Sequence, residues 1–304
     1  MKKDLLSIQD LTVRDILDIL GLAADVKAHG ARYASRLKGK SIGLIFQKPS
    51  MRTRVSFEIG MYQLGGNSIY LGSSEIGMGG RESVKDIACV LSRYLNGIVA
   101  RTYKHQVVEE LAKYASIPII NGLSDRAHPC QALGDMLTIK EKFGSFKGVK
   151  LAYIGDGNNV LNSLMLLAAK LGMDVSVATP KKYEPEAGIA DLVKAMASKT
   201  GSKIGFSNDP KRTAQNADVL YTDVWVSMGQ EKEAAKRVKV FKDFQLNDTT
   251  SSLAAARHIV MHCLPAHRGQ EITDSVMDSK HSVVYDQAEN RMHVQKAILL
   301  KLLK

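Results

Sequence analysis

The sequence predicts an α/β protein with two domains of similar size, each a mainly parallel sheet flanked by helices. Short apolar runs alternate with amphipathic stretches along the chain, which is the pattern of strand–helix units with parallel strands. The length of 304 residues suits one large or two medium domains. The stretch 143–148 follows a helical pattern, contains two glycines and precedes a new strand–helix unit. We therefore place a domain boundary there.

The strands are predicted from short apolar runs bounded by polar or turn-forming residues. In the first half of the chain these runs are Ser41–Phe46, Ser68–Leu71, Gly97–Ala100 and Ile117–Ile120. In the second half they are Lys150–Ile154, Asp174–Ala178, Lys203–Phe206, Val219–Thr222, His258–Met261 and Val283–Tyr285.

Helical patterns lie between these runs. One begins at Thr12, which has the spacing of a capping box with Asp15. Another runs from Arg52 to Leu64 and stops at two glycines. The last helix, roughly Asn290 to Leu303, has apolar residues on most faces, as a buried helix does. We expect residues 1–146 to form the first domain, 147–287 the second, and a helix at about 288–304 to pack back on the first.

The net charge of +11 indicates anionic partners. Nucleic acid and a small phosphorylated substrate both fit it, and so does an evenly basic surface without any specific partner. No nucleic-acid-binding motif accompanies the charge, so we expect no nucleic-acid partner.

The cysteines Cys89, Cys130 and Cys263 are odd in number and sparse, which argues against a disulfide framework and fits a reducing compartment. No pair has zinc-ligand spacing. Apolar runs are far too short to span a bilayer, and the N-terminus lacks the apolar core of a signal peptide. We therefore expect a cytoplasmic protein with no membrane partner.

The segment Ser50–Arg54 is the sharpest local signal. It follows a predicted strand and opens a helix, where free N–H groups and the helix dipole favour an anion. Ser50 and Thr53 add hydroxyls, and Arg52 adds a planar fork suited to phosphate. The alternative is that Ser50 only caps the helix and the arginines are solvated.

Two further segments follow predicted strands of the same domain. Arg101 comes directly after the run Gly97–Ala100, and the segment His128–Gln131 comes after Ile117–Ile120 at a helix start. In an open parallel sheet, ligands gather at the carboxyl ends of the strands. A histidine beside two arginine-bearing strand ends therefore favours a ligand contact over a core position.

In the second domain, Gly155–Asn159 resembles a dinucleotide turn but has Val160 where the third glycine belongs. The strand Asp174–Ala178 ends without an acidic residue to hold a ribose. NAD binding is therefore disfavoured, and Asn159 at the helix start suits a carboxylate instead.

Three more segments carry polar groups at strand ends or at a helix start. Asp223 suits an ammonium group and Ser227 a carboxylate, although a polar loop around a buried tryptophan explains them equally well. Cys263 also ends a strand, where the alternative is a small buried apolar residue. Arg291 lies near the start of the last helix, where the alternative is a solvated arginine.

Together these motifs resemble a known family. Ser-x-Arg-Thr-Arg, a strand-end arginine and His-Pro-x-Gln resemble the carbamoyl phosphate domain of the carbamoyltransferases. Asp-x-Trp-x-Ser-Met-Gly and His-Cys-Leu-Pro resemble the ornithine branch of that family and are absent from the aspartate-using branch. The resemblance runs from about Leu5 to the end of the chain, with all motifs in family order.

The resemblance implies transfer of a carbamoyl group from carbamoyl phosphate to ornithine at an active site between the two domains, without a cofactor or metal. It implies that Arg101, His128 and Cys263 are catalytic. Carbamoyl phosphate would contact Ser50, Met51, Arg52, Thr53, Arg101, His128, Pro129, Cys130, Gln131, Cys263, Leu264 and Arg291. Ornithine would contact Asn159, Asp223, Ser227 and Met228.

The family also forms homotrimers, or multiples of trimers, in which a loop from one subunit completes a neighbour's active site. Here that loop would be Ser74–Glu82. It lacks the glutamine that the family often has, and Arg81 is a candidate replacement. Met51 also stands where the family has threonine, although that position offers mainly its backbone N–H. Within the class, putrescine or an acylated ornithine remains an alternative acceptor.

Overall fold

The computed structural model describes residues 1–78, 80–227 and 229–303. The chain divides into two compact units, of which unit 1 comprises Met1–Leu137 with Glu289–Lys304 and unit 2 comprises Thr138–Ala288. The division falls inside α6 (Pro129–Phe143) and inside α13 (Val284–Leu302). No helix in the described ranges combines the length and apolarity needed to cross a membrane.

Unit 1 contains a four-stranded parallel sheet in the order β2-β1-β3-β4. Its strands are β1 (Ser41–Phe46), β2 (Asn67–Gly72), β3 (Gly97–Arg101) and β4 (Ile119–Leu123). The central strand β3 is buried throughout, as expected of a parallel strand covered on both faces. The register against β4 shifts between Ala100 and Arg101, at the end of β3.

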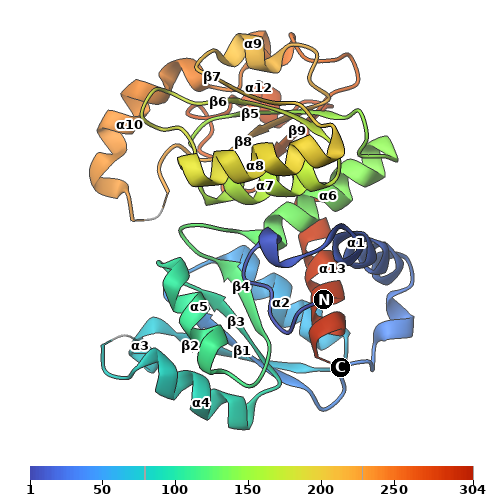
Figure 1. Cartoon of the computed structure of the whole chain (residues 1–304), viewed down its shortest axis with the longest axis vertical. Helices are drawn as coiled ribbons and strands as arrows, with labels where there is room; N and C mark the ends of the chain where they lie inside the picture. Colours follow the sequence, from blue (N-terminus) through green and yellow to red (C-terminus); the bar gives the residue numbers. More distant parts are fainter. Residues whose placement is uncertain (79, 228, 304) are drawn as a thin grey trace. The chain divides into compact units, whose positions relative to one another are not determined.

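Helices cover both faces of this sheet. Helices α4 and α5 lie on one face, and α1, α2 and α13 lie on the other (Figure 1). The helical elements are η1 (Ile8–Asp10), α1 (Val13–Ala28), η2 (Gly30–Tyr33), α2 (Met51–Gln63), α3 (Ser73–Ile76), α4 (Val84–Tyr94) and α5 (His105–Tyr114). The predicted capping box of Thr12 and Asp15 begins α1. Buried residues such as Ile87, Ile98 and Val108 form the core between α4, α5 and the sheet.

Unit 2 contains a five-stranded parallel sheet in the order β7-β6-β5-β8-β9. Its strands are β5 (Lys150–Ile154), β6 (Asp174–Ala178), β7 (Ile204–Ser207), β8 (Val219–Thr222) and β9 (Ile259–His262). Its helices include α7 (Asn159–Lys170), α8 (Ala187–Thr200), α9 (Pro210–Ala214), η3 (Glu231–Glu233), α10 (Ala234–Phe241), η4 (Lys242–Phe244), α11 (Asp248–Ser251) and α12 (Asp274–Met277). Helices α7 and α8 lie side by side along one face of the sheet (Figure 1).

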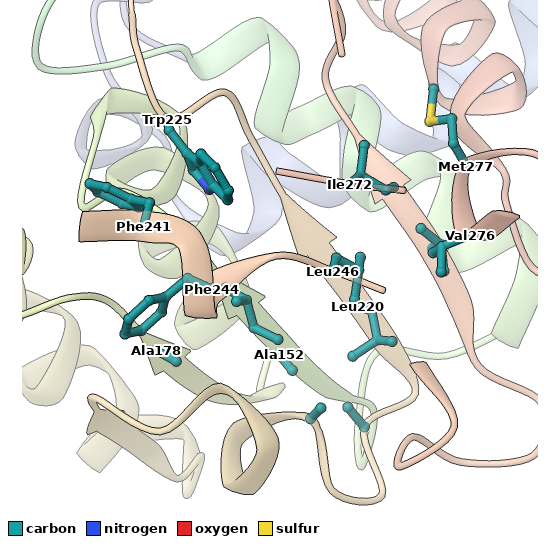
Figure 2. Packing of buried hydrophobic residues seen from close by; sticks show 14 of the residues in the cluster. Ala152, Ala178, Leu220, Trp225, Phe241, Phe244, Leu246, Ile272, Val276 and Met277 are labelled. Atoms are coloured by element: carbon teal, nitrogen blue, oxygen red, sulfur yellow. The ribbon is translucent and has the colours of Figure 1, made fainter. Parts of the chain in front are cut away.

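The core of unit 2 on the opposite face is built from strand residues and aromatic side chains. Figure 2 shows Trp225, Phe241 and Phe244 close to one another, with Leu220 on β8 nearby. The ring centroids of Trp225 and Phe241 are 5.9 Å apart. Burial of large aromatic side chains contributes strongly to core energetics, so this cluster anchors the loop that carries Trp225.

The predicted fold class is confirmed, and four predicted strands have the predicted bounds: β1, β5, β6 and β8. The prediction of a strand at Val283–Tyr285 is wrong. Ser282 forms an isolated bridge with Val260 of β9, the N–H of Val283 donates to the carbonyl of Val260, and the helix α13 begins at Val284. β-branched and aromatic residues have strand propensity, but the helical pattern that follows them prevails here. The strand expected from Ile117 starts at Ile119, because Pro118 has no N–H to give the ladder.

Candidate active site

Each unit carries polar residues at the topological switch point of its sheet. In unit 1, β1 and β3 are neighbours whose following strands lie on opposite sides of the pair, and β1 leads to Ser50 while β3 ends at Arg101. In unit 2, β5 and β8 have the same relation, and they lead to the turn 155–158 and to Asp223. Ligands of open α/β sheets bind at such points.

Ser50 is the N-cap of α2, and its hydroxyl accepts a hydrogen bond from the N–H of Thr53 at 3.3 Å. The helix cap that the sequence offered as the alternative for Ser50 is therefore present. Thr53 is buried, and its hydroxyl lies 3.5 Å from Nη1 of Arg101 and 3.5 Å from Nη2 of Arg291. The first turn of α2 thus meets two buried guanidinium groups, an arrangement that favours a multiply charged anion. Met51 is exposed at this turn, and Arg52 is half-buried.

Arg291 is fixed by α6 as well as by α2. Its Nη1 donates to Oε1 of Gln131 at 3.0 Å, and Nε2 of Gln131 donates to Oδ1 of the fully buried Asp135 at 2.8 Å. Gly134 permits this contact, because a Cβ there would lie 3.0 Å from the Cα of Arg291. The bonds set the orientation of the Gln131 amide.

His128 stands immediately before α6, and its carbonyl accepts the N–H groups of Gln131 and Ala132. Its ring is buried. Burial, followed by the positive charges of Arg291, Arg101 and Lys48, holds the pKa of His128 well below its ordinary value. The imidazole is therefore neutral, so it offers a hydrogen bond without adding a fourth charge.

Pro129 and Cys130 begin α6 and are both buried. The thiol of Cys130 contacts the carbonyl of Asn121 at 3.6 Å. Burial raises the pKa of Cys130 to about 12, so this residue is a neutral packing group and not a nucleophile.

Lys48 was not among the site residues predicted from the sequence. Its side chain is only 7% exposed, and it lies close enough to Arg101 and His128 for the charges to interact. Its Nζ is 5.2 Å from the ring centroid of Tyr103. Burial and the neighbouring charge of Arg101 lower the pKa of Lys48 to about 8. In the sequence, the only indication that Lys48 belongs to this site is its position two residues before Ser50.

In unit 2, Asp223 is the centre of a hydrogen-bonded cluster. Its Oδ2 accepts from Nδ2 of Asn158 at 2.7 Å, and its Oδ1 accepts from the N–H of Val224 at 2.8 Å and from Sγ of Cys263 at 3.0 Å. The carboxylate is 5% exposed. An ionised carboxylate has about four acceptor positions, so one remains for an ammonium group.

The turn after β9 places Cys263 beside Asp223. Leu264 has a positive φ of 58°, and its N–H donates to Nδ1 of His262 at 2.9 Å. Nε2 of His262 is 3.1 Å from Oε1 of Glu271, and both side chains are fully buried. With Nδ1 as the acceptor of the bond from Leu264, Nε2 is the nitrogen that donates to Glu271. His262 and Glu271 thereby fix the turn that carries Cys263.

The other predicted ornithine contacts lie around this cluster. Asn159 is the first residue of α7, and its neighbour Asn158 is the cap that bonds Asp223. Ser227 is half-buried, and its N–H donates to Oε1 of Gln230 at 3.1 Å. Met228 lies outside the described residues. The sequence reasoning missed Asn158, although an asparagine at an N-cap position is a strong local signal.

Both parts of the chain match models of one family. Residues 3–141 match the carbamoyl-P binding domain of aspartate/ornithine carbamoyltransferase, and residues 147–302 match its Asp/Orn binding domain. The chain belongs to the aspartate/ornithine carbamoyltransferase family.

Relatives in this family are similar along almost the whole chain. The ornithine carbamoyltransferase of Pyrococcus horikoshii is 51% identical over 303 residues, which cover 99% of this chain and 96% of the relative. A Pyrococcus furiosus relative named "Ornithine carbamoyltransferase, anabolic" is 51% identical over 299 residues, covering 98% and 95%. A solved ornithine carbamoyltransferase structure from Pyrococcus furiosus superposes with a TM-score of 0.94 at 52% identity, covering 97% and 95%.

Ligand atoms of Asp223, His262 and Cys263 lie within 4.8 Å of one another, a spacing that a metal ion accepts. However, both ring nitrogens of His262 already have partners within the protein. A metal would have to displace one of these buried bonds, so the donor set suits an amine ligand of Asp223 better than an ion.

In the loop expected to reach a neighbour's site, several of the described residues contact their own chain. Arg81 donates from Nη2 to the carbonyl of Glu75 at 2.9 Å, and the Glu75 carboxylate accepts from the N–H of Gly72 at 2.7 Å. A pocket of about 310 Å3 lies beside this loop. It is lined by Ile45, Phe46, Gln47, Ser73, Ile76, Met78 and Tyr103.

Proposed function

We propose that this protein transfers the carbamoyl group of carbamoyl phosphate to the δ-amine of L-ornithine, giving L-citrulline and phosphate. The main support for the proposal is that each sheet has a polar cluster at its switch point. One is a cationic cluster around Thr53, and the other is a carboxylate cluster around Asp223. The first suits a phosphate and the second an α-amino acid. The anabolic relative supports a role in arginine synthesis.

Carbamoyl phosphate would bind at the start of α2. The N–H groups of the first turn, the hydroxyls of Ser50 and Thr53 and the guanidinium of Arg52 would hold the phosphate, with the backbone of Met51 contributing. Arg101 and Arg291 would add charge from β3 and α13. Pro129 and Cys130 would shape the wall behind the carbamoyl group.

The carbamoyl group itself would be held by residues at the start of α6. Neutral His128 and Arg101 would donate to the carbonyl oxygen, while Gln131 and the carbonyl of Leu264 would accept from the carbamoyl NH₂. Donors placed in advance around that oxygen stabilise the negative charge that develops as the amine attacks, which is the main source of catalysis in such sites.

Ornithine would bind through its α-amino acid end. Asp223 would accept from the α-ammonium, and Asn159, Ser227 and Met228 would hold the carboxylate. The stretch 224–229 contains neither arginine nor lysine, so it offers nothing for the second carboxylate of aspartate. This composition supports ornithine over aspartate as the acceptor.

The attacking δ-amine must be neutral, although a free alkylammonium has a pKa around 10. Cys263 would lie near this amine, with its thiol held by Asp223 at 3.0 Å. The amine nitrogen then attacks the carbamoyl carbon, the bond to the phosphate oxygen breaks, and the departing phosphate takes the proton. No side chain is assigned as the general base.

We also propose a homotrimer, or a multiple of it, in the cytoplasm. On α2, Met51, Val55, Ile59 and Tyr62 are exposed at 41–77% and their spacing places them on one helix face. An exposed apolar stripe of this kind suits contact with a second copy of the chain. The free thiols support a reducing compartment.

The test is phosphate release from carbamoyl phosphate with and without ornithine, with citrulline identified by mass spectrometry. The proposal predicts that phosphate and citrulline form in equal amounts and only when ornithine is present. Phosphate release that does not depend on ornithine, or a carbamoylated product with another amine only, would contradict it.

A further inference from the structure

Arg237 is a buried arginine that the proposed chemistry does not use. It lies on α10, and only 4% of its surface is exposed. Its Nη2 is 2.5 Å from Oδ2 of Asp156, and its Nε donates to the carbonyl of Trp225 at 2.5 Å. Its Nη1 is 3.7 Å from the carboxylate of Glu233 on the solvent side. One guanidinium group therefore contacts a carboxylate and a backbone carbonyl that belong to two different segments.

These two partners belong to the two loops that carry the proposed ornithine site. Asp156 lies in the turn after β5, two residues before Asn158, whose amide donates to Asp223. Trp225 lies in the loop after β8, midway between Asp223 and Ser227. Arg237 thus connects the first loop to the second.

The surroundings make these bonds sensitive to substitution. The guanidinium carbon lies 4.8 Å from the ring centroid of Tyr183 and 5.2 Å from that of Phe241. Figure 2 shows Phe241 close to Trp225 inside the apolar cluster of unit 2. Hydrogen bonds are electrostatically stronger in such a medium than in water, and a partner left without its bond there carries a larger penalty.

Stability alone does not account for an arginine at this position. Replacement of a buried ion pair by well-packed apolar residues is often neutral or stabilising. What arginine supplies is a rigid, planar cation that pairs with Asp156 through Nη2 while Nε donates to the carbonyl of Trp225, a fixed geometry that the single ammonium of lysine does not offer. We therefore relate the arginine to the relative position of the two loops that it contacts.

We propose that Arg237 is a positioning residue for the acceptor amino acid. By holding Asp156 and the carbonyl of Trp225, it fixes the loop that carries Asp223 and Ser227 relative to the turn that leads to Asn159. An α-amino acid presents its ammonium and carboxylate on one carbon, so their partners must stand at a set distance. The inference rests on the proposed ornithine site, and Arg237 itself touches no substrate.

The experiment is steady-state kinetics on the full-length enzyme, with each substrate varied in turn below the melting temperature of every variant. Arg237→Gln should raise KM for ornithine about tenfold or more, since it removes a charge-assisted bond to a buried group. KM for carbamoyl phosphate should stay within about twofold, because Asp156, Glu233 and Trp225, which Arg237 contacts, are not among the residues proposed to hold that substrate. Arg237→Lys, which keeps the charge but not the planar fork, should fall between wild type and Arg237→Gln.

The matched control is Arg268→Gln, which removes an arginine that pairs with Asp274 and Asp278 at 2.8 and 2.6 Å on the surface of the same unit. Both KM values of this control should match wild type. A merely structural role for Arg237 would lower the melting temperature without changing KM for ornithine in the folded variant.

Two results would overturn the inference: a folded Arg237→Gln variant with wild-type KM for ornithine, or an equal rise in both KM values. Should Arg237→Gln fail to fold, Asp156→Asn decides, because it removes the charge of the partner with little change of shape. An ornithine KM unchanged in Asp156→Asn would equally overturn the inference. Wild-type enzyme that does not use ornithine at all would instead overturn the proposed function, and the same assay shows this before any variant is made.

Discussion

The substitution Asp223→Asn should impair the use of ornithine while leaving the binding of carbamoyl phosphate nearly unchanged. The carboxylate accepts from Asn158, Val224 and Cys263, and it would also accept from the α-ammonium of ornithine. Loss of a hydrogen bond between charged partners costs about 1.5–3 kcal/mol, which is roughly a 10- to 150-fold loss in affinity. The new amide NH₂ would also face the NH₂ of Asn158, whose oxygen is already committed to capping α7. This conflict adds a penalty on the order of 1 kcal/mol or more.

The assay is kcat/KM for ornithine together with calorimetric affinity for carbamoyl phosphate. We expect kcat/KM to fall by about one hundredfold or more, and carbamoyl phosphate affinity to stay within about twofold. The matched control is Asp218→Asn at the other end of the same strand, where the side chain accepts the N–H of Lys150 at 2.9 Å. That control should leave kcat/KM unchanged. A normal kcat/KM in Asp223→Asn would refute the placement of the α-ammonium.

Arg52→Ala should weaken carbamoyl phosphate at least about tenfold by calorimetry, and wild-type affinity would show that the phosphate is misplaced. The lowered pKa of His128 means that its ring stays neutral as pH falls from 8 to 6; an NMR titration with a midpoint near the ordinary value of 6.5 would contradict this. Light scattering at micromolar concentration should give the mass of a trimer or its multiple, and Tyr62→Glu on the exposed stripe of α2 should reduce it. A fully active wild-type monomer would rule out a shared active site.

The parts of the site that sequence could predict are those fixed by local pattern. Ser50–Thr53, Arg101 and Asp223 each follow or end a strand, and parallel strands deliver their carboxyl ends to one edge of the sheet. Because the sheet of unit 1 is parallel, the proximity of Ser50–Thr53 to Arg101 followed from the order of elements alone. The same order placed Asp223 at the carboxyl edge of the sheet of unit 2. The N-cap at Ser50 also depends on local sequence alone, and it forms as expected at the start of α2.

The remaining parts depend on contacts between distant segments. Arg291 bonds Gln131 across 160 residues, and Arg237 bonds Asp156 through an ion pair that no spacing rule reveals. Burial decides the charge of His128 and the pKa of Lys48, and burial depends on the packing of several elements at once. The wrong strand at Val283–Tyr285 has a different origin, since the propensity of three residues favoured a strand while the pattern of the longer segment that follows favoured a helix.

The identity of the acceptor is the central claim, and a competition experiment tests it most directly. Ornithine and putrescine at equal concentration are incubated with limiting carbamoyl phosphate, and the ratio of citrulline to carbamoylputrescine gives the ratio of the two kcat/KM values. Putrescine would leave the donors for the carboxylate unpaired, at a cost of about 1–3 kcal/mol, so ornithine should win by at least about tenfold. Equal amounts of the two products would contradict the account, even with carbamoyl transfer itself demonstrated.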